Sequence, residues 1–234
     1  MGELILCSHP IAAMPYYIDN ISLNVYSLEE LCYYMENHLY LIEADFMSEE
    51  LCLWIGQELG DKELAQSMRS VLLGNGNLSD FTELILRSCG YCSEDTIRHI
   101  RSVLLDMQNK SVFECSKIRA DRYMESEKYV KAIHEYRKLL GMEEECKKNP
   151  VLEGNIRHNL GTACARLFLF DEAATNFLNA YRLNQNRESL TACMAACRLA
   201  KKTDILKKYK EEFHVSDEAF KSMSDQWNAV LKSE

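Results

Sequence analysis

Proline and glycine are scarce in this sequence, which has 3 prolines and 9 glycines among 234 residues. These two residue types supply many of the tight turns that a β-sandwich or β-barrel needs between its short strands. Helices joined by short connections need far fewer such turns. The scarcity therefore predicts a mostly α-helical protein.

Long apolar runs and an excess of positive charge are missing as well. No stretch approaches the roughly 18 consecutive apolar residues of a membrane-spanning helix, and residues 1–20 lack the basic and apolar regions of a secretory leader. The formal net charge is −9, whereas sequence-independent nucleic-acid binding depends on Lys and Arg against phosphates. We therefore expect a cytoplasmic protein with no membrane and no nucleic acid among its partners.

Cysteine is abundant by comparison, with ten in the sequence. A cytosolic chain of this size keeps its thiols reduced and does not depend on disulfides for stability. We therefore expect most of the cysteines to be small apolar residues of the core.

The first 26 residues show the pattern of short strands. Ile21, Leu23 and Val25 alternate with polar neighbours, and an apolar residue at every second position is typical of a half-buried strand. The pattern predicts one or two short strands that form a β-hairpin. An irregular arm lying on the helices is the alternative, because two prolines interrupt the segment.

From position 27 onward, five polar residues mark the starts of successive helices. The side chain of a serine or aspartate accepts a hydrogen bond from a free backbone N–H of the first helical turn, so these residues often precede helices. The expected caps are Ser27, Ser48, Asp61, Ser79 and Ser93. Together they predict a helical domain with an N-terminal hairpin over residues 1–109, for which we identify no family.

The second expected domain, residues 110–234, contains an internal repeat. Segment 129–133 (Tyr-Val-Lys-Ala-Ile) matches segment 170–174 (Phe-Asp-Glu-Ala-Ala) 41 residues later. Ahead of the second copy lies the run 159–163 (Asn-Leu-Gly-Thr-Ala), and Phe177 and Ala180 follow it. This spacing resembles the tetratricopeptide repeat, whose usual period is about 34 residues.

The resemblance covers about residues 113–213 and implies an α-solenoid, a stack of antiparallel helix pairs. The extra residues between the two copies are expected in segment 141–149, as a helix or loop. A looser third copy is indicated over residues 190–213, with Lys207 at the place of Ala173. Residues 216–234 are then expected to form a capping helix that covers the end of the stack.

The resemblance also implies that the first helix of each pair lines an inner groove that holds an extended peptide or a partner helix. The matching positions are polar and of mixed charge: Lys117, Asp121, Asn155, His158, Asn159, Thr162 and Arg166. Some family members grip a C-terminal carboxylate at such positions, but Asp121 replaces an asparagine that this clamp needs. A plain solvated helix face is the structural alternative for each residue. We therefore hypothesise a non-enzymatic adaptor or scaffold that binds a protein or peptide and needs no cofactor.

A different function is indicated by Cys89-Gly-Tyr-Cys92. Paired cysteines at this spacing exchange disulfides or bind zinc, and Cys193 and Cys197 offer two more thiols on one helix face. No strand of a βαβ unit precedes the pair, and no HExxH, GxSxG or P-loop motif occurs. A redox or zinc-dependent protein that uses Cys89 and Cys92 is the alternative function. A regulator whose first domain binds an effector is a third possibility.

Overall fold

The computed structural model describes residues 8–74 and 76–222 of the chain. Internal contacts divide the chain into two compact units, residues 1–111 and 112–234, whereas the sequence boundary was expected after residue 109. Helices dominate the described residues of both units, and the described strands form one hairpin in the first unit. The fold is therefore mostly α with a short N-terminal hairpin, as expected. None of the described helices combines the length and apolar character needed to cross a membrane.

The hairpin consists of β1 (Tyr16–Ile18) and β2 (Leu23–Val25), which pair antiparallel with Tyr16 opposite Val25. Ser22 has a left-handed backbone conformation in the connecting turn. Ile18 and Val25 are buried, so their face of the hairpin contributes to the core. The expected hairpin is confirmed, and the alternative of an irregular arm is wrong for residues 16–25.

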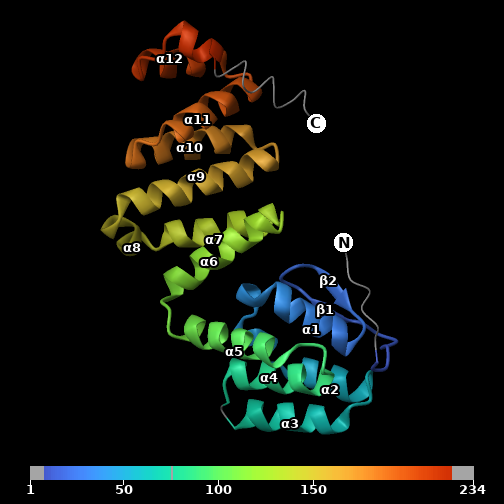
Figure 1. Cartoon of the computed structure of the whole chain (residues 1–234). Helices are drawn as coiled ribbons and strands as arrows, with labels where there is room; N and C mark the ends of the chain where they lie inside the picture. Colours follow the sequence, from blue (N-terminus) through green and yellow to red (C-terminus); the bar gives the residue numbers. More distant parts are fainter. Residues whose placement is uncertain (1–7, 75, 223–234) are drawn as a thin grey trace. The chain divides into compact units, whose positions relative to one another are not determined.

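The described residues of the first unit also form five α-helices, and Figure 1 shows them gathered beside the hairpin. They are α1 (Leu28–Asn37), α2 (Glu49–Gln57), α3 (Lys62–Leu73), α4 (Leu78–Cys89) and α5 (Glu94–Gln108). Two short 3-10 turns, Leu39–Leu41 and Ala44–Phe46, connect α1 to α2. Apolar residues of α1 and α4 form the centre of the core, where Leu31, Met35, Phe81 and Ile85 are fully buried.

Four of the five expected caps are confirmed: the side chains of Ser27, Ser48, Asp61 and Ser93 each accept a hydrogen bond from the backbone N–H three residues on. The fifth expectation is wrong, because α4 begins at Leu78 and Asn77 is its cap. Asn77 Oδ1 accepts from the Asp80 N–H at 2.9 Å, and its amide donates to the Asp80 carboxylate. Ser79 lies inside the helix and is buried.

The second unit is built from consecutive helices in a helical-repeat architecture, and Figure 1 shows α7, α9, α10 and α11 lying one upon the next. The helices are α6 (Val112–Glu125), α7 (Tyr129–Gly141), α8 (Glu143–Lys148), α9 (Pro150–Arg166), α10 (Phe170–Asn184), α11 (Arg187–Leu199) and α12 (Thr203–Glu212). Helix α9 packs against α7 and α10, and α10 packs against α11. The extra segment between the two sequence copies forms the short helix α8.

The turns inside the three helix pairs α6/α7, α9/α10 and α11/α12 repeat one backbone geometry. Glu127, Phe168 and Lys201 each have positive φ, at 57°, 61° and 57°, and each lies two residues before the second helix of its pair. The residue after each of them donates a backbone hydrogen bond back into the preceding helix, over 2.8–2.9 Å. Among the described residues this turn thus occurs inside all three pairs, and it recurs after α12, where His214 has a φ of 52° and the Val215 N–H donates to a backbone oxygen of α12 at 2.9 Å.

This alignment corrects one detail of the third copy. Leu206 follows Lys201 by five residues, as Ala132 follows Glu127 and Ala173 follows Phe168. An apolar residue therefore stands at the place where the sequence comparison had put Lys207. Residues 217–222 of the expected capping helix are helical, while its remainder, 223–234, lies outside the described residues.

Close approach of α9 and α10 depends on small residues. A β-carbon at Gly161 would lie 2.8 Å from two ring atoms of Phe177, and one at Gly154 would lie 3.1 Å from the Ala180 backbone oxygen. Ala173 and Ala180 are fully buried in the same contact. These small residues therefore allow α9 and α10 to approach closely.

Candidate functional site

The first helices of the three pairs are α6, α9 and α11, and their polar side chains bond to one another. Lys117 Nζ donates to Asp121 Oδ2 at 2.7 Å within α6, and Tyr136 of α7 donates its hydroxyl to Asp121 Oδ1 at 2.7 Å. The Asn159 amide of α9 reaches the same Oδ1 at 3.4 Å. Asp121 therefore links α6, α7 and α9.

The hydrogen bond from Tyr136 fixes the position of the Asp121 carboxylate. The tyrosine is fully buried, and both burial and the neighbouring Asp121 carboxylate raise the pKa of Tyr136 above its usual value. The hydroxyl therefore stays protonated and acts as the donor. This contact gives Asp121 a structural role in addition to its place on the expected groove.

A second bridge joins α9 to α11. His158 Nδ1 lies 2.9 Å from Ser189 Oγ, and its ring lies 5.2 Å from the Phe177 ring. Burial lowers the pKa of His158, so the imidazole is neutral at pH 7. Thr162 Oγ1 donates to the His158 backbone oxygen at 3.1 Å.

The last two expected groove residues, Asn155 and Arg166, also lie on α9, and Arg166 is its final residue. Asn155 Oδ1 accepts from the Asn184 amide of α10 at 3.0 Å. Arg166 is exposed and forms no ion pair with the described residues. The structure thus joins Lys117, Asp121 and Asn159 in one network and Thr162 to His158, while Asn155 bonds separately to α10 and Arg166 is exposed.

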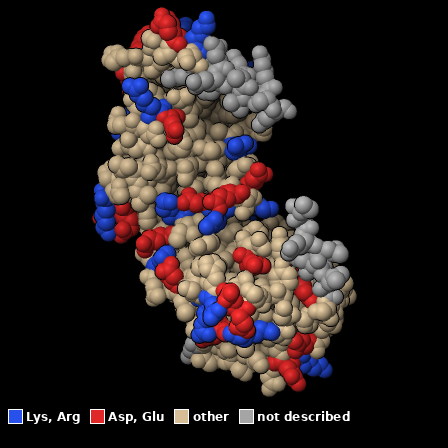
Figure 2. Space-filling model, in the orientation of Figure 1, with Lys and Arg blue, Asp and Glu red and all other residues tan. Residues whose placement is uncertain are grey.

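Charged side chains are mixed in sign on the molecular face drawn in Figure 2, where Lys and Arg lie beside Asp and Glu. In the first unit, Arg87 pairs with Glu83 and with Glu94, each at 2.7 Å. In the second unit, Arg137 pairs with Glu172 at 2.6 Å. Much of the positive charge is therefore neutralised locally.

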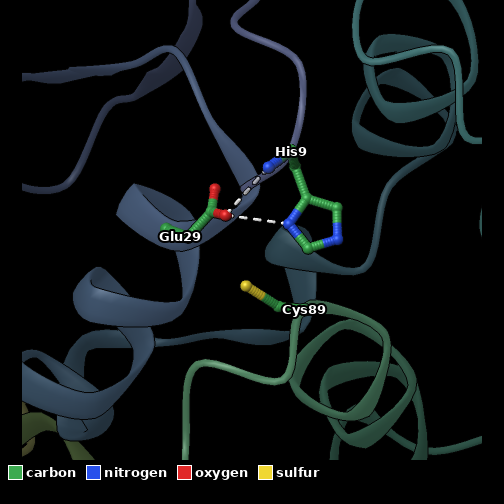
Figure 3. Close-up of side chains that lie close together, drawn as sticks. All are labelled: His9, Glu29 and Cys89. Carbon is green, nitrogen blue, oxygen red and sulfur yellow. Dashed lines mark hydrogen bonds and ion pairs between the residues drawn. The ribbon is translucent and has the colours of Figure 1, made fainter. Parts of the chain in front are cut away.

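A second cluster, which the sequence did not reveal, lies in the first unit. His9, Glu29 and Cys89 come from the segment before the hairpin, from α1 and from the end of α4, and Figure 3 shows the side chains of His9 and Cys89 next to the Glu29 carboxylate. One ligand-type atom from each of the three residues lies within 4.8 Å of the other two. We call these residues the His9–Glu29–Cys89 cluster.

Glu29 is the centre of this cluster. Its Oε1 accepts from His9 Nδ1 at 2.8 Å, from the backbone N–H groups of Ser8 and His9 at 2.7 and 3.1 Å, and from Ser8 Oγ at 3.0 Å. Burial disfavours the charged carboxylate, but these hydrogen bonds outweigh burial and lower the pKa of Glu29 to about 2. The bond to Glu29 in turn raises the pKa of His9.

Cys89 differs from its neighbour Cys92. A hydrogen bond between the thiols of Cys89 and Cys32 lowers the pKa of Cys89 and raises that of Cys32. Burial raises the pKa of Cys92 to about 11. The thiol in contact with Cys89 therefore belongs to Cys32 of α1, whereas the sequence had paired Cys89 with Cys92.

Comparisons of the chain with protein-family models, with curated proteins and with solved structures find no match.

Proposed function

We propose that residues 112–234 form a tetratricopeptide-like module that binds a peptide or a partner helix without catalysis. The binding surface, which we call the groove face, consists of Lys117, Asp121, Asn155, His158, Asn159, Thr162 and Arg166. The recurrence of one turn geometry inside all three helix pairs supports the repeat assignment. We place the module in the cytoplasm, where its free thiols at Cys164, Cys193 and Cys197 stay reduced.

The observation that carries this proposal is a stripe of polar side chains along α9. Asn155, Asn159, Thr162 and Arg166 follow one another at intervals of four, three and four residues, so they lie on one side of the helix. Eleven residues of helix span about 16 Å. This length matches about five residues of extended peptide at roughly 3.3 Å each.

The chemistry of the stripe suits a peptide backbone. An asparagine side chain both donates and accepts hydrogen bonds, as a peptide group does, and Arg166 adds an exposed cation. The bridges from Asn159 to Asp121 and from His158 to Ser189 hold the neighbouring first helices next to α9. A ligand on α9 therefore also meets side chains of α6 and α11.

Capture experiments with variant baits test this proposal. Full-length wild-type protein and an Asn159→Ala/Arg166→Ala variant serve as baits in native cytosol. Losing two side-chain contacts of an interface weakens binding about tenfold or more when either contact contributes strongly. We therefore expect at least one protein to be captured by the wild type and to fall about tenfold in the variant.

A control variant with the same residue types, Asn176→Ala/Arg137→Ala, lies on the second helices α10 and α7 and should capture as the wild type does. Circular dichroism confirms that each bait is folded. Asp121 is left unchanged, because its removal takes the acceptor from the buried Tyr136 hydroxyl. Equal capture by the wild type and by the groove variant would contradict the assignment of the groove face.

A further inference from the structure

We propose that the His9–Glu29–Cys89 cluster, completed by Cys32, is a zinc-binding site in the first unit. Its ligand atoms are an imidazole nitrogen, a carboxylate oxygen and two thiolate sulfurs. Zinc binds all three atom types and prefers four ligands in a tetrahedron. Thiolate and imidazole together favour zinc over magnesium or calcium, which take oxygen ligands.

Spacing supports a common ion for the first three residues. Zinc–ligand bonds of about 2.0–2.3 Å place tetrahedral ligand atoms roughly 3.3–3.8 Å apart. The ligand-type atoms of His9, Glu29 and Cys89 lie within 4.8 Å of one another. The distance from His9 Nδ1 to Glu29 Oε1 is 2.8 Å. Zinc binding therefore requires Nδ1 and Oε1 to move apart by about 0.5 Å or more and Nδ1 to lose the proton of this hydrogen bond.

The Glu29 carboxylate provides an independent observation. Glu29 is only 2% exposed. Its Oε2 atom is buried and has no hydrogen-bond partner among the described residues. The other oxygen, Oε1, carries all of the donors described above. Buried polar atoms are nearly always satisfied by a partner, and a cation bound at the cluster would supply one for Oε2 of Glu29.

We assign the fourth ligand to Cys32, which neighbours Cys89 but lies outside the set of three atoms that are within 4.8 Å of one another. Its side chain must therefore move toward them to bind the ion. Cys32 lies three residues after Glu29 on α1, so both side chains are on the same side of that helix. It is fully buried, and its thiol bonds to the Cys89 sulfur. Zinc bound between the two sulfurs replaces that shared proton, and binding releases the thiol protons to solvent.

An ion reaches the site from solvent along His9. The His9 side chain is 28% exposed and lines an open pocket of about 450 Å³ together with Pro10, Leu28 and residues 59–63. Asp61 and Glu63 outnumber the one lysine of the pocket wall, Lys62, so the wall carries a net negative charge that attracts cations. Bound zinc joins the segment before the hairpin to α1 and α4, so its expected role is to stabilise the first unit.

Metal titration of the full-length protein tests the site. Protein stripped with a chelator and kept reduced is titrated with Co²⁺, whose thiolate charge-transfer band reports sulfur ligation, and then with Zn²⁺ against a chromophoric competitor. We expect one Co²⁺ per chain with a thiolate band, displaced by one Zn²⁺. A wild-type protein without this band, or without tight Zn²⁺ binding, would overturn the proposal.

Three variants locate the ligands. Removing even outer-shell partners of zinc costs about 10- to 100-fold in affinity, so His9→Ala and Cys89→Ser are each expected to weaken Zn²⁺ binding at least about 100-fold. Cys92→Ser is the matched control and should bind as the wild type does. Loss in Cys92→Ser with unchanged binding in His9→Ala would assign the metal to the Cys89/Cys92 pair instead and overturn the proposal.

A variant that fails to fold would also lose metal binding, so the test includes a variant that is expected to stay folded. His9 is partly exposed, so His9→Ala is expected to keep its circular dichroism spectrum and decides the question if Cys89→Ser is unfolded. The titration is also independent of the groove face, because partner capture and metal binding are read separately. Either proposal can therefore fail without the other.

Discussion

Gly161→Leu is expected to destabilise the second unit by about 3 kcal/mol. A β-carbon at this position lies 2.8 Å from the Cδ1 and Cε1 atoms of Phe177, whose ring is only 4% exposed. The ring has no open space to move into, so α9 and α10 must separate. The gain in helix propensity from replacing glycine is about 1 kcal/mol and does not offset this cost.

Hydrogen exchange read by mass spectrometry on peptides from α9 and α10 gives the local free energy of opening for this comparison. Gly141→Leu is the control, because a β-carbon at Gly141 meets no atom within 4 Å, so the substitution should not destabilise α9 and α10 and should add at most the helix-propensity gain of about 1 kcal/mol in α7. Adding Phe177→Ala to Gly161→Leu should recover part of the loss. If the two glycine variants exchange alike, close approach of α9 and α10 does not limit stability.

Trp54→Ala is expected to destabilise the first unit by about 3–5 kcal/mol. The Trp54 ring is 7% exposed and lies 5.8 Å from the Tyr16 ring, between α2 and the hairpin. Its Nε1 donates to the Met14 backbone oxygen at 2.8 Å. One side chain therefore holds both the hairpin and the segment that precedes it.

Thermal unfolding and hydrogen exchange over residues 12–26 measure this effect. Trp54→Phe is the matched comparison, because phenylalanine keeps most of the apolar contact and loses the hydrogen bond, whose removal costs about 1 kcal/mol. The hairpin should therefore exchange far faster in Trp54→Ala than in Trp54→Phe. Equal effects of the two substitutions would show that the hydrogen bond, and not packing, dominates at this position.

The sequence predicted those parts of the fold that depend on local chemistry. A serine or aspartate before an apolar run identified four helix starts, and the alternation of residues 21–25 identified a strand. The error at Ser79 arose because Asn77 is an equally good cap two residues earlier. Local patterns thus give the existence of a helix more reliably than its first residue.

The repeat was visible in the sequence only where packing restricts residue type. Gly161 and Ala173 are small because helices touch there, so the first two copies align. The recurring turns at Glu127, Phe168 and Lys201 leave no such signal, because their left-handed backbone is imposed by the flanking helices and not by glycine. Because the turn positions are not visible in the sequence, the alignment of the third copy was wrong by one residue and placed Lys207, in place of Leu206, at the position of Ala173.

The sequence predicted the residues of the groove face but not the His9–Glu29–Cys89 cluster, because contacts between distant segments leave no local pattern. The groove face followed from a resemblance that assigns positions along a helix, but its bonds from Asp121 to Tyr136 and from His158 to Ser189 depend on how helices pack. His9, Glu29 and Cys89 are 20 and 60 residues apart and follow no short ligand motif. Only the folded first unit brings them together.

Site-specific photo-crosslinking tests the groove face most directly. A photoreactive amino acid at Arg166, the exposed end of the α9 stripe, is compared with the same probe at Thr175, an exposed position on α10. We predict that the partner identified by capture is crosslinked from position 166 and not from position 175. A partner crosslinked equally from both positions, or only from position 175, would contradict the account.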